Sequence, residues 1–377
     1  MPANHERALD ALLRRGRLRS LDAANGIDFT SNDYLGLAQS PELADAVAEA
    51  VARGVPIGSG GSRLLRGNHP EHEALEADAA RFFGAETALF FGGGFIANTA
   101  MLATLPLRGD LIVYDELIHA SAHDGMRLSK AEAVAARHND PQSFDDRITA
   151  WRARGGVGQP WIVVESLYSM DGDRAPVDDI ASLAERHDAM LIIDEAHATG
   201  VFGADGRGLA AYLEGRPNII TLHTCGKALG VMGALVLAPK SIRDFLVNRA
   251  RAFIYATAPS PLVAAAVRAS LKICQAQPER REKLHRLIAF AGGKLKSETR
   301  HVPSGSQIQP IIIGSDTAAV SLASAMRARG YDVRAIRPPT VPEGTARLRL
   351  TLTLNTDEAG LSRLIADLAA AEAEAPV

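Results

Sequence analysis

Short apolar segments recur along the first two thirds of the chain, and each ends at a glycine or a polar turn. They alternate with stretches of helical periodicity and read TALFFGG (87–93), DLIVYDE (110–116), PWIVVES (160–166), AMLIIDEA (189–196), NIITLHT (218–224) and GALVLAP (233–239). Continuous apolar strands that alternate with helices are typical of a parallel sheet covered on both faces. The pattern therefore predicts an α/β fold with a mostly parallel central sheet.

The pattern changes after about residue 260. A helical stretch over 261–298 comes first, and then shorter strand candidates at 308–314, 331–337 and 346–353 with helices at 317–330 and 357–374. Short strands mixed with helices predict a smaller α+β domain. We therefore expect an N-terminal helical segment over 1–35, a large α/β domain over 36–262 and a small C-terminal domain over 263–377.

Composition and charge exclude several classes of protein. The chain carries 41 basic and 44 acidic residues and no long basic run, which argues against a dedicated nucleic-acid surface. The two cysteines, Cys225 and Cys274, form no CxxC pair, and such sparse use fits a reducing compartment. No signal-peptide core and no apolar run of about 18 residues is present. We expect a cytoplasmic protein that acts on neither membranes nor nucleic acid.

The strand end MLIIDEAHATG (190–200) has two interpretations. As the acidic motif of a nucleotide-driven helicase it would require an upstream phosphate loop, GxxxxGK[ST], and the sequence has none. The pair Gly226–Lys227 lies downstream of Asp194 and is followed by alanine where serine or threonine is required. Asp194 and His197 must then face a different ligand, because ligands of open α/β sheets bind at the carboxyl ends of the strands.

Two other kinds of site also lack their motifs. No GxSxG elbow of a serine hydrolase occurs. The segment HEALE (72–76) begins like a zinc-protease helix but has Glu76 at the position of the second histidine. His69 and His72 have no further histidine or cysteine nearby, so we expect no metal site.

Lys227 lies in a turn of small residues between two apolar segments, where a bulky ligand could approach it. Pyridoxal phosphate requires a lysine for its aldehyde, a carboxylate beside its ring nitrogen and backbone N–H groups for its phosphate. Asp194 supplies a carboxylate at a strand end. The segment FFGGGFIANTAMLATL (90–105) predicts a strand, a glycine turn and a helix that could hold the phosphate.

These features belong to a longer series of motifs. The chain resembles the α-oxoamine synthase family of fold-type I pyridoxal-phosphate enzymes. The matching segments are FTSNDYLGLA (29–38), GSGGSRLLRGNHPEHEALE (58–76), FFGGGFIANTA (90–100), DELIHASAHDG (115–125), ARHND (136–140), SLYSMDGDRAPV (166–177), DEAHATGVFGADGRG (194–208), TCGKALGVMGA (224–234), IYATAPSP (254–261) and AIRPPTVPEGTARLRLTLT (335–353). The resemblance implies a large α/β domain followed by a smaller α+β domain.

The resemblance also implies roles for individual residues around the cofactor ring. Lys227 would form the Schiff base and later move the Cα proton of the substrate. Asp194 would pair with the ring nitrogen and His197 with the ring hydroxyl, with Ser169 near the same edge. His119 would stack on the ring.

The cofactor phosphate would be bound mainly by backbone N–H groups. The resemblance places Gly93, Gly94 and Phe95 at these contacts and adds the hydroxyl group of Thr224. Thr257 matches a threonine that reaches the phosphate from a partner subunit. We therefore expect a homodimer with shared active sites.

Substrate binding is implied for three further residues. Arg349 matches the arginine that binds the amino-acid carboxylate, and a planar guanidinium suits that group. Asn32 matches an asparagine near the same carboxylate. Arg19 falls at the position of an arginine for the acyl substrate, with Arg17 as a competing candidate. For Arg347 we expect the opposite strand face and a structural role.

The implied reaction is a decarboxylative condensation of L-alanine with a pimeloyl thioester, carried by coenzyme A or an acyl carrier protein, in biotin biosynthesis. The alternative is a sister enzyme that uses glycine or serine, such as 2-amino-3-ketobutyrate ligase. Ser62 leaves more room than the threonine of the glycine-using aminolevulinate enzymes and favours alanine. The chain departs from the family pattern at Ile118, Ala198 and His223, and we expect His223 to be a core histidine.

Overall fold

The computed structural model describes residues 3–374 and divides into two units. Of the described residues, unit 1 comprises 3–34, 169–173 and 282–374, and unit 2 comprises 35–168 and 174–281. The described part of the expected N-terminal segment 1–35, except its last residue, thus groups with the C-terminal residues. Residues 263–281 group with the large unit. The three-part division into domains stays a prediction.

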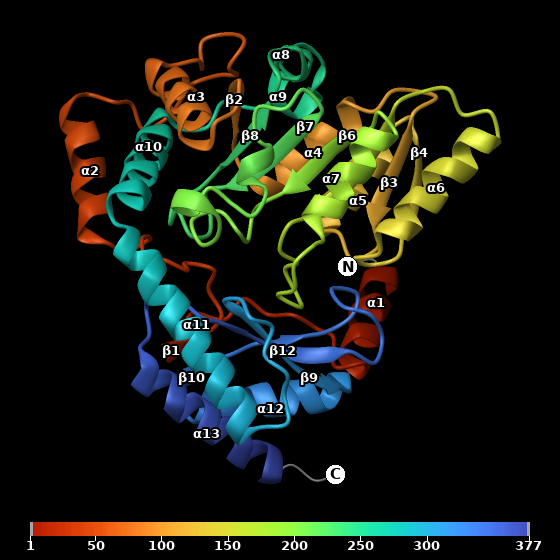
Figure 1. Cartoon of the computed structure of the whole chain (residues 1–377). Coiled ribbons are helices and arrows are strands. Elements are labelled where there is room, and N and C mark those ends of the chain that lie inside the picture. The colour runs from red at the N-terminus through yellow and green to blue at the C-terminus, as the bar shows by residue number, and fades with distance from the viewer. Residues whose placement is uncertain (1–2, 375–377) are drawn as a thin grey trace. The chain divides into compact units, whose positions relative to one another are not determined.

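The core of unit 2 is a seven-stranded sheet (Figure 1). Its strands, in spatial order, are β2 (Thr87–Phe91), β8 (Ala234–Ala238), β7 (Ile219–Thr224), β6 (Met190–Asp194), β5 (Pro160–Glu165), β3 (Leu111–Asp115) and β4 (Glu132–Ala136). Strands β4, β3, β5, β6 and β7 run parallel, and β8 is antiparallel to both of its neighbours. The predicted α/β class with a mostly parallel sheet is confirmed.

Alternation along the strands explains why their sequences are apolar throughout. On β5, Trp161 and Val163 face one hydrophobic cluster, whereas Ile162 and Val164 face the other. The first cluster includes residues of α4 (Gly94–Thr104), α5 (Ala120–Leu128), α8 (Lys240–Arg249) and α9 (Arg251–Ile254). The second includes residues of α6 (Pro141–Ala153) and α7 (Val177–Arg186). Since both faces are covered, the parallel strands are buried on both sides, as such sheets require.

Three more helices belong to unit 2. They are α2 (Pro41–Ala52), α3 (Pro70–Phe83) and α10 (Pro261–Ala276). Helix α10 packs against the other two, and α3 packs on β2 and β8. Two short 3₁₀ helices, η1 (Ala204–Gly206) and η2 (Ala211–Leu213), follow β6. His69 and His72 cap α3, since Nδ1 of each accepts a backbone N–H group. Their positions thus have a structural explanation.

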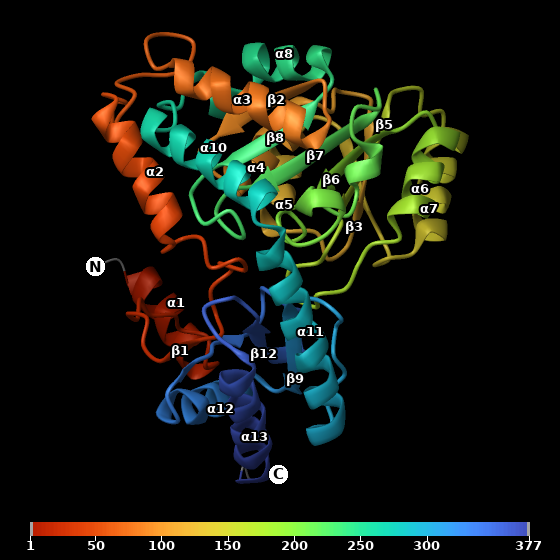
Figure 2. The same cartoon turned by 60° about the vertical axis from the view of Figure 1, so that its left-hand side comes forward.

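Unit 1 contains an antiparallel sheet in the order β11 (Ala335–Ile336), β12 (Ala346–Thr351) and β9 (Ile308–Gly314), which Figure 2 shows among its helices. A parallel pair joins β1 (Ile27–Asp28) to β10 (Tyr331–Asp332). Its helices are α1 (Ala3–Arg14), α12 (Asp316–Ala328), α13 (Glu358–Glu374) and α11 (Pro278–Glu298), which belongs to unit 1 from Glu282 onward. Among the described residues, no helix is long and apolar enough to cross a membrane.

Several predicted boundaries shift for clear reasons. The predicted helix over 261–298 is two helices, because Pro278 lacks the N–H group that a continuous helix needs. The helical N-terminal segment ends at Arg14, and Gly16 follows with a φ of 64°. The strand expected over 331–337 is split into β10 and β11. Strand β4, at the edge of the large sheet, was not predicted.

Candidate active site

Asp194 ends β6 at the carboxyl edge of the large sheet, and both of its carboxylate oxygens are bound. Oδ1 accepts the N–H of Ala196 at 2.9 Å. Oδ2 accepts a hydrogen bond from Nδ2 of Asn98, a residue of α4, and the two atoms are 2.6 Å apart. The residue is only 7% exposed, so these bonds set the direction of a carboxylate that is nearly enclosed. An enclosed, oriented carboxylate can stabilise a positive nitrogen on a bound ring.

The same amide connects Asp194 to His119. Asn98 Nδ2 also donates to Ser121 Oγ at 3.1 Å, and Ser121 Oγ lies 2.7 Å from His119 Nδ1. His119 Nδ1 accepts the backbone N–H of Ser121, so this nitrogen carries no proton. Burial lowers the pKa of His119, and the nearby Lys227 charge lowers it further while Asp194 opposes both effects. His119 is therefore a neutral imidazole that shares its surroundings with Asp194 and Lys227.

Lys227 lies in the short connection between β7 and the antiparallel strand β8. Two hairpin bonds close this connection: Cys225 N–H to the Gly233 carbonyl at 2.9 Å and Val231 N–H to the Cys225 carbonyl at 2.9 Å. Gly230 has a φ of 65°, and a Cβ atom there would come 2.5 Å from the backbone nitrogen of Ala38. The turn around the lysine is thus tightly packed against the 37–38 segment.

The N-terminus of α4 forms a recess beside Thr224. Gly93 precedes the helix without a side-chain cap, and a Cβ atom at that position would meet no atom within 4 Å. A Cβ atom on Gly94 would lie 3.4 Å from Thr224 Oγ1 and would narrow the space. Phe95, in the first turn, is 49% exposed and meets the His119 ring edge to face with centroids 6.3 Å apart. Uncapped N–H groups with a neighbouring hydroxyl suit a phosphate.

Unit 2 therefore satisfies the three chemical requirements of pyridoxal phosphate. Lys227 supplies the amine, Asp194 the enclosed carboxylate, and the α4 N-terminus with Thr224 the anion recess. The donor set fits the cofactor.

After Asp194 the chain makes one helical turn, in which Ala198 N–H and Thr199 N–H both donate to the Glu195 carbonyl. His197 lies in this turn and is buried. The position follows directly from the strand end, because the turn begins as soon as β6 stops. His197 is thereby carried on the same short segment as Asp194.

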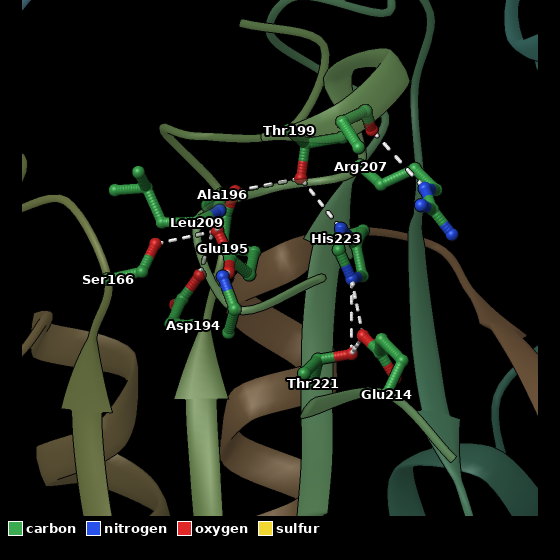
Figure 3. Close-up of polar contacts among 12 residues, drawn as sticks. Ser166, Asp194, Glu195, Ala196, Thr199, Arg207, Leu209, Glu214, Thr221 and His223 are labelled. Carbon is green, nitrogen blue, oxygen red and sulfur yellow. Dashed lines mark hydrogen bonds and ion pairs between the residues drawn. The ribbon is translucent and has the colours of Figure 1, made fainter. Parts of the chain in front are cut away.

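The Glu195 carboxylate fixes the rest of this loop (Figure 3). Its oxygens accept from Ser166 Oγ at 2.6 Å, from Leu209 N–H at 3.1 Å and from Ala210 N–H at 2.5 Å. Burial raises the pKa of Glu195, and the His223 charge and these hydrogen bonds oppose the rise. A Cβ atom on Gly208, whose φ is 106°, would come 2.7 Å from the carboxylate. The loop is folded around this side chain.

Thr257 is exposed on the loop between α9 and α10. The next residue, Ala258, donates its N–H to the Gly61 carbonyl at 2.9 Å, and Ser59 Oγ donates to the Pro259 carbonyl at 2.6 Å. These bonds join the Thr257 loop to the glycine-rich segment at 58–67. The glycines of that segment allow a close fold, since a Cβ atom on Gly67 would overlap the Gly61 carbonyl.

Unit 1 holds the second group of predicted residues around Arg349. The guanidinium donates from Nε to the Ser169 carbonyl at 2.6 Å, from Nη1 to Thr351 Oγ1 at 2.8 Å and from Nη2 to Asn32 Oδ1 at 3.1 Å. Asn32 Oδ1 also accepts from the Tyr34 hydroxyl at 3.0 Å. Arg349 is 8% exposed, so its plane is fixed before any ligand arrives. The structure thus brings Ser169, Asn32 and Arg349 together within unit 1.

Arg347 lies two residues before Arg349 on β12, and alternation along a strand places both on the same face, so the expectation of the opposite face is wrong. Arg347 is buried and donates to the Asp171 carboxylate and to the Thr345 carbonyl. Both partners belong to the protein, in keeping with a structural role. Arg349 and Arg347 therefore have different surroundings on one strand.

The N-terminal arginines also differ in their partners. Arg17 forms ion pairs with Asp316 at 2.6 Å and Glu343 at 2.7 Å. Arg19 contacts Thr340 Oγ1 at 3.4 Å and lines a groove of unit 1 that is also lined by Arg327, Arg334, Arg337 and Asp22. Arg17 is thus committed to carboxylates of the protein itself, and Arg19 is the better placed of the two to meet an acidic ligand.

Two residues of this network were not identified from the sequence: Asn98, which orients Asp194, and Glu195, which organises the following loop. Asn98 is a polar residue within the apolar helical segment FFGGGFIANTA, and this was the available signal. Its partner is 96 positions away. Glu195 lies within the DEAH segment, in which the sequence predicts ligand-facing roles only for Asp194 and His197.

Comparison with known proteins relates the whole chain to one family. The profile of the aminotransferase class I and II family matches residues 24–368. The 8-amino-7-oxononanoate synthase of Chromobacterium violaceum is 43% identical over 363 residues, covering 94% of this chain and 93% of the relative. The solved 8-amino-7-oxononanoate synthase of Francisella tularensis is 28% identical with a TM-score of 0.76, covering 93% and 98% of the two chains. A serine palmitoyltransferase variant from S. paucimobilis with bound PLP–myriocin is 26% identical with a TM-score of 0.87, covering 99% and 97%.

Proposed function

Because the chain belongs to the 8-amino-7-oxononanoate synthases of the aminotransferase class I and II family, we propose that it condenses L-alanine with a pimeloyl thioester to give 8-amino-7-oxononanoate, CO₂ and a free thiol in biotin biosynthesis. The observation that carries this proposal is the 43% identity to a named synthase over 94% of the chain. The enzyme is a pyridoxal-phosphate-dependent acyltransferase of fold type I, as expected from the sequence. The sister reactions with glycine or serine are the alternative.

The cofactor, when bound, supplies an electron-withdrawing ring that accepts charge from the substrate Cα. Asp194 would hold a proton on the ring nitrogen, since its two oxygens are already oriented by Ala196 and Asn98. His119 would lie against the ring as a neutral imidazole and add no competing positive charge. The phosphate would be bound by N–H groups at Gly93, Gly94 and Phe95 and by the Thr224 hydroxyl.

Lys227 would remove the Cα proton of alanine and return a proton after CO₂ has left. The packed hairpin holds its backbone in place, so only the side chain needs to move. His197 would bind the ring hydroxyl, and Ser169 would lie at the same edge. These roles make Lys227, His119, Asp194 and His197 the proposed catalytic residues.

Arg349 would bind the alanine carboxylate through its terminal N–H groups. Asn32 would keep the guanidinium in plane from one side and the Ser169 carbonyl from another, as their hydrogen bonds support. Arg19 would pair with the distal carboxylate of the pimeloyl chain. The competing candidate, Arg17, is already paired with two carboxylates of the protein, which favours Arg19 for this role. Thiol release from coenzyme A or an acyl carrier protein is compatible with these contacts.

We also propose a cytoplasmic homodimer in which Thr257 of one protomer reaches the phosphate site of the other. The exposure of Thr257 and of large apolar side chains on nearby loops supports this. Tyr255 is 71% exposed, and Ile57, Leu64 and Leu65 of the adjoining loop are also exposed. Such apolar surface is expected to be covered in the assembled enzyme.

A panel of substrates tests the proposal. Purified enzyme with pyridoxal phosphate would receive alanine, glycine or serine, each combined with pimeloyl or acetyl thioesters of coenzyme A and of an acyl carrier protein. Thiol release and mass spectrometry would identify the products. Release restricted to alanine and a pimeloyl thioester supports the synthase, whereas release with glycine and acetyl-CoA alone would assign the chain to a sister enzyme.

A further inference from the structure

His223 lies at the end of β7, directly before Thr224, and is fully buried. Its ring packs on Phe83 of α3 with centroids 3.9 Å apart. Both ring nitrogens meet polar partners: Nδ1 is 2.8 Å from Thr199 Oγ1, and Nε2 is 3.1 Å from Thr221 Oγ1 and 3.4 Å from Glu214 Oε1 (Figure 3). A core histidine with polar partners on both sides requires a consistent placement of protons.

The contact with Thr199 identifies the donor at Nδ1. Thr199 Oγ1 lies 2.7 Å from the Glu195 carbonyl, which only accepts hydrogen bonds, so the single hydroxyl proton points there. Thr199 Oγ1 can then only accept from His223. His223 Nδ1 therefore carries a proton.

The other side of the ring shares one proton with Glu214. Thr221 Oγ1 donates to Glu214 Oε1 at 2.5 Å, so the proton that completes the contact with Nε2 belongs to His223. If Nε2 were unprotonated, Thr221 would donate to it, and Glu214 would need a proton of its own. In either case the buried pair as a whole is neutral.

The bonds of this imidazole join two strand ends. Through Thr199 it reaches the turn that carries Asp194 and His197, and along the chain it leads to Thr224 and the Lys227 hairpin. The same turn is held from the other side by the Glu195 carboxylate. His223 thus links the segment expected to bind the cofactor ring to the segment that carries Lys227 and is expected to bind the cofactor phosphate.

We propose that His223, through its contacts with Thr199 and Thr221, is a positioning residue that sets the Asp194–His197 turn relative to the Thr224–Lys227 hairpin. The proposal rests on the proposed roles of these residues toward pyridoxal phosphate. It does not depend on which acyl donor or amino acid the enzyme uses. Most of the test therefore needs no substrate.

The decisive variant is His223→Leu, which keeps the apolar packing on Phe83 and removes both polar ring nitrogens. We expect the dissociation constant of pyridoxal phosphate to rise about tenfold to a hundredfold, the effect typical of losing partners that orient site ligands. The pH midpoint of the bound cofactor's visible absorption should shift as well. His223→Asn retains a donor near Nδ1 and should restore much of the affinity.

The matched control is His301→Leu in unit 1, because His301 is also a buried histidine paired with a glutamate, Glu372, at 2.8 Å. This variant should lower stability without changing cofactor affinity or the absorption titration. If His223→Leu fails to fold, Thr199→Val tests the same link, since it keeps the imidazole and removes its acceptor. If the folded variant, His223→Leu or Thr199→Val, binds the cofactor with wild-type affinity and shows the wild-type absorption titration, the proposal is overturned.

The protonation state is tested directly by NMR of protein labelled with ¹⁵N in histidine. His223→Asn identifies the His223 signals by their loss. A proton on Nδ1 is expected in the apo as well as the holo enzyme, because Thr199 can only accept there. A ring whose Nδ1 carries no proton would overturn the proposed link to Thr199. If the substrate panel assigned another acyl donor while these results held, only the proposed function would change.

Discussion

Asn98 Nδ2 lies 2.6 Å from Asp194 Oδ2 and 3.1 Å from Ser121 Oγ, so one amide of α4 orients both the strand-end carboxylate and the hydroxyl beside His119. The amide has no charge and does not compete with Asp194 for a proton. Helix α4 therefore contributes at two points: its N-terminus forms the anion recess and its second turn directs the carboxylate.

Replacing Asn98 by Ala should weaken this orientation without removing any group that reacts. A hydrogen bond to a charged partner contributes about 1.5–3 kcal/mol, so we expect kcat to fall about tenfold to a hundredfold. Steady-state kinetics and cofactor titration check this. Asn248→Ala, at an exposed position of α8, serves as the control, and equal kinetics of the two variants would refute the role.

Replacing Asp194 by Asn preserves shape but removes the charge beside the ring nitrogen. We expect the cofactor to remain bound through Lys227 and the α4 recess, while exchange of the alanine Cα proton slows by about 10²–10³-fold, as when other electrostatic groups of active sites are lost. Exchange of the Cα proton into deuterated water measures this step alone. Unchanged exchange would show that another group protonates the ring.

Replacing Arg349 by Lys keeps the charge but loses the planar pair of donors. The Michaelis constant for alanine should rise about tenfold to a hundredfold, and kcat should fall as well, because the lost contact binds the alanine carboxylate that later leaves as CO₂. Arg347→Lys on the same strand is the control and should affect unfolding more than the Michaelis constant. The reverse pattern would exchange the roles of the two arginines.

Replacing Gly208 by Ala should destabilise unit 2 more than a comparable change elsewhere. Gly54 has a φ of 81° and open space around it, so Gly54→Ala should cost only the left-handed strain of about 1–2 kcal/mol. At Gly208 the new methyl group also crowds the Glu195 carboxylate and should add about 1–3 kcal/mol. Urea denaturation of the two variants gives the comparison, and equal losses would contradict it.

Stability should decline as the solution is acidified through the range of histidine titration. Burial lowers the pKa of His72, whose Nε2 donates to the Pro259 carbonyl at 2.7 Å. Below about pH 6.5 the unfolded chain then binds more protons than the folded one, so this stability is present above that pH and lost as pH falls.

The measurement is the free energy of unfolding at about pH 8 and about pH 5 for the wild type and for His72→Gln. Glutamine can still donate to Pro259 and does not titrate. The loss on acidification should be smaller in the variant, and the other titrating groups cancel in the difference. If the two proteins lose the same free energy of unfolding on acidification, His72 does not contribute to the pH dependence.

The large sheet could be predicted from the sequence because its central strands are buried on both faces and therefore read as apolar runs. Strand β4 could not, since EAVAA lies at the sheet edge with Glu132 and Ala133 exposed. Alanine and glutamate favour helices, so local preference and the tertiary pairing with β3 disagree there.

The candidate site likewise contains residues that the sequence predicts and residues that are recognised only in the folded structure. Asp194 and Lys227 lie in segments whose neighbours predict their chemistry, whereas the role of Arg349 is implied only by the family resemblance. Asn98 is identified only by its partner across 96 positions, which the fold brings close. The role expected of Thr257 depends on a second chain, so neither a single sequence nor a single protomer can establish it.

The antiparallel strand β8 has a consequence for turnover. Because β7 returns at once into β8, Lys227 sits on a short tether whose ends are hydrogen-bonded to each other. In the proposed cycle, a lysine displaced by substrate would stay at high effective concentration on such a tether, and its return would be an intramolecular event. The closed hairpin would thus favour recapture at the end of each cycle, and a longer connection at this point would slow the final step before it affected the first.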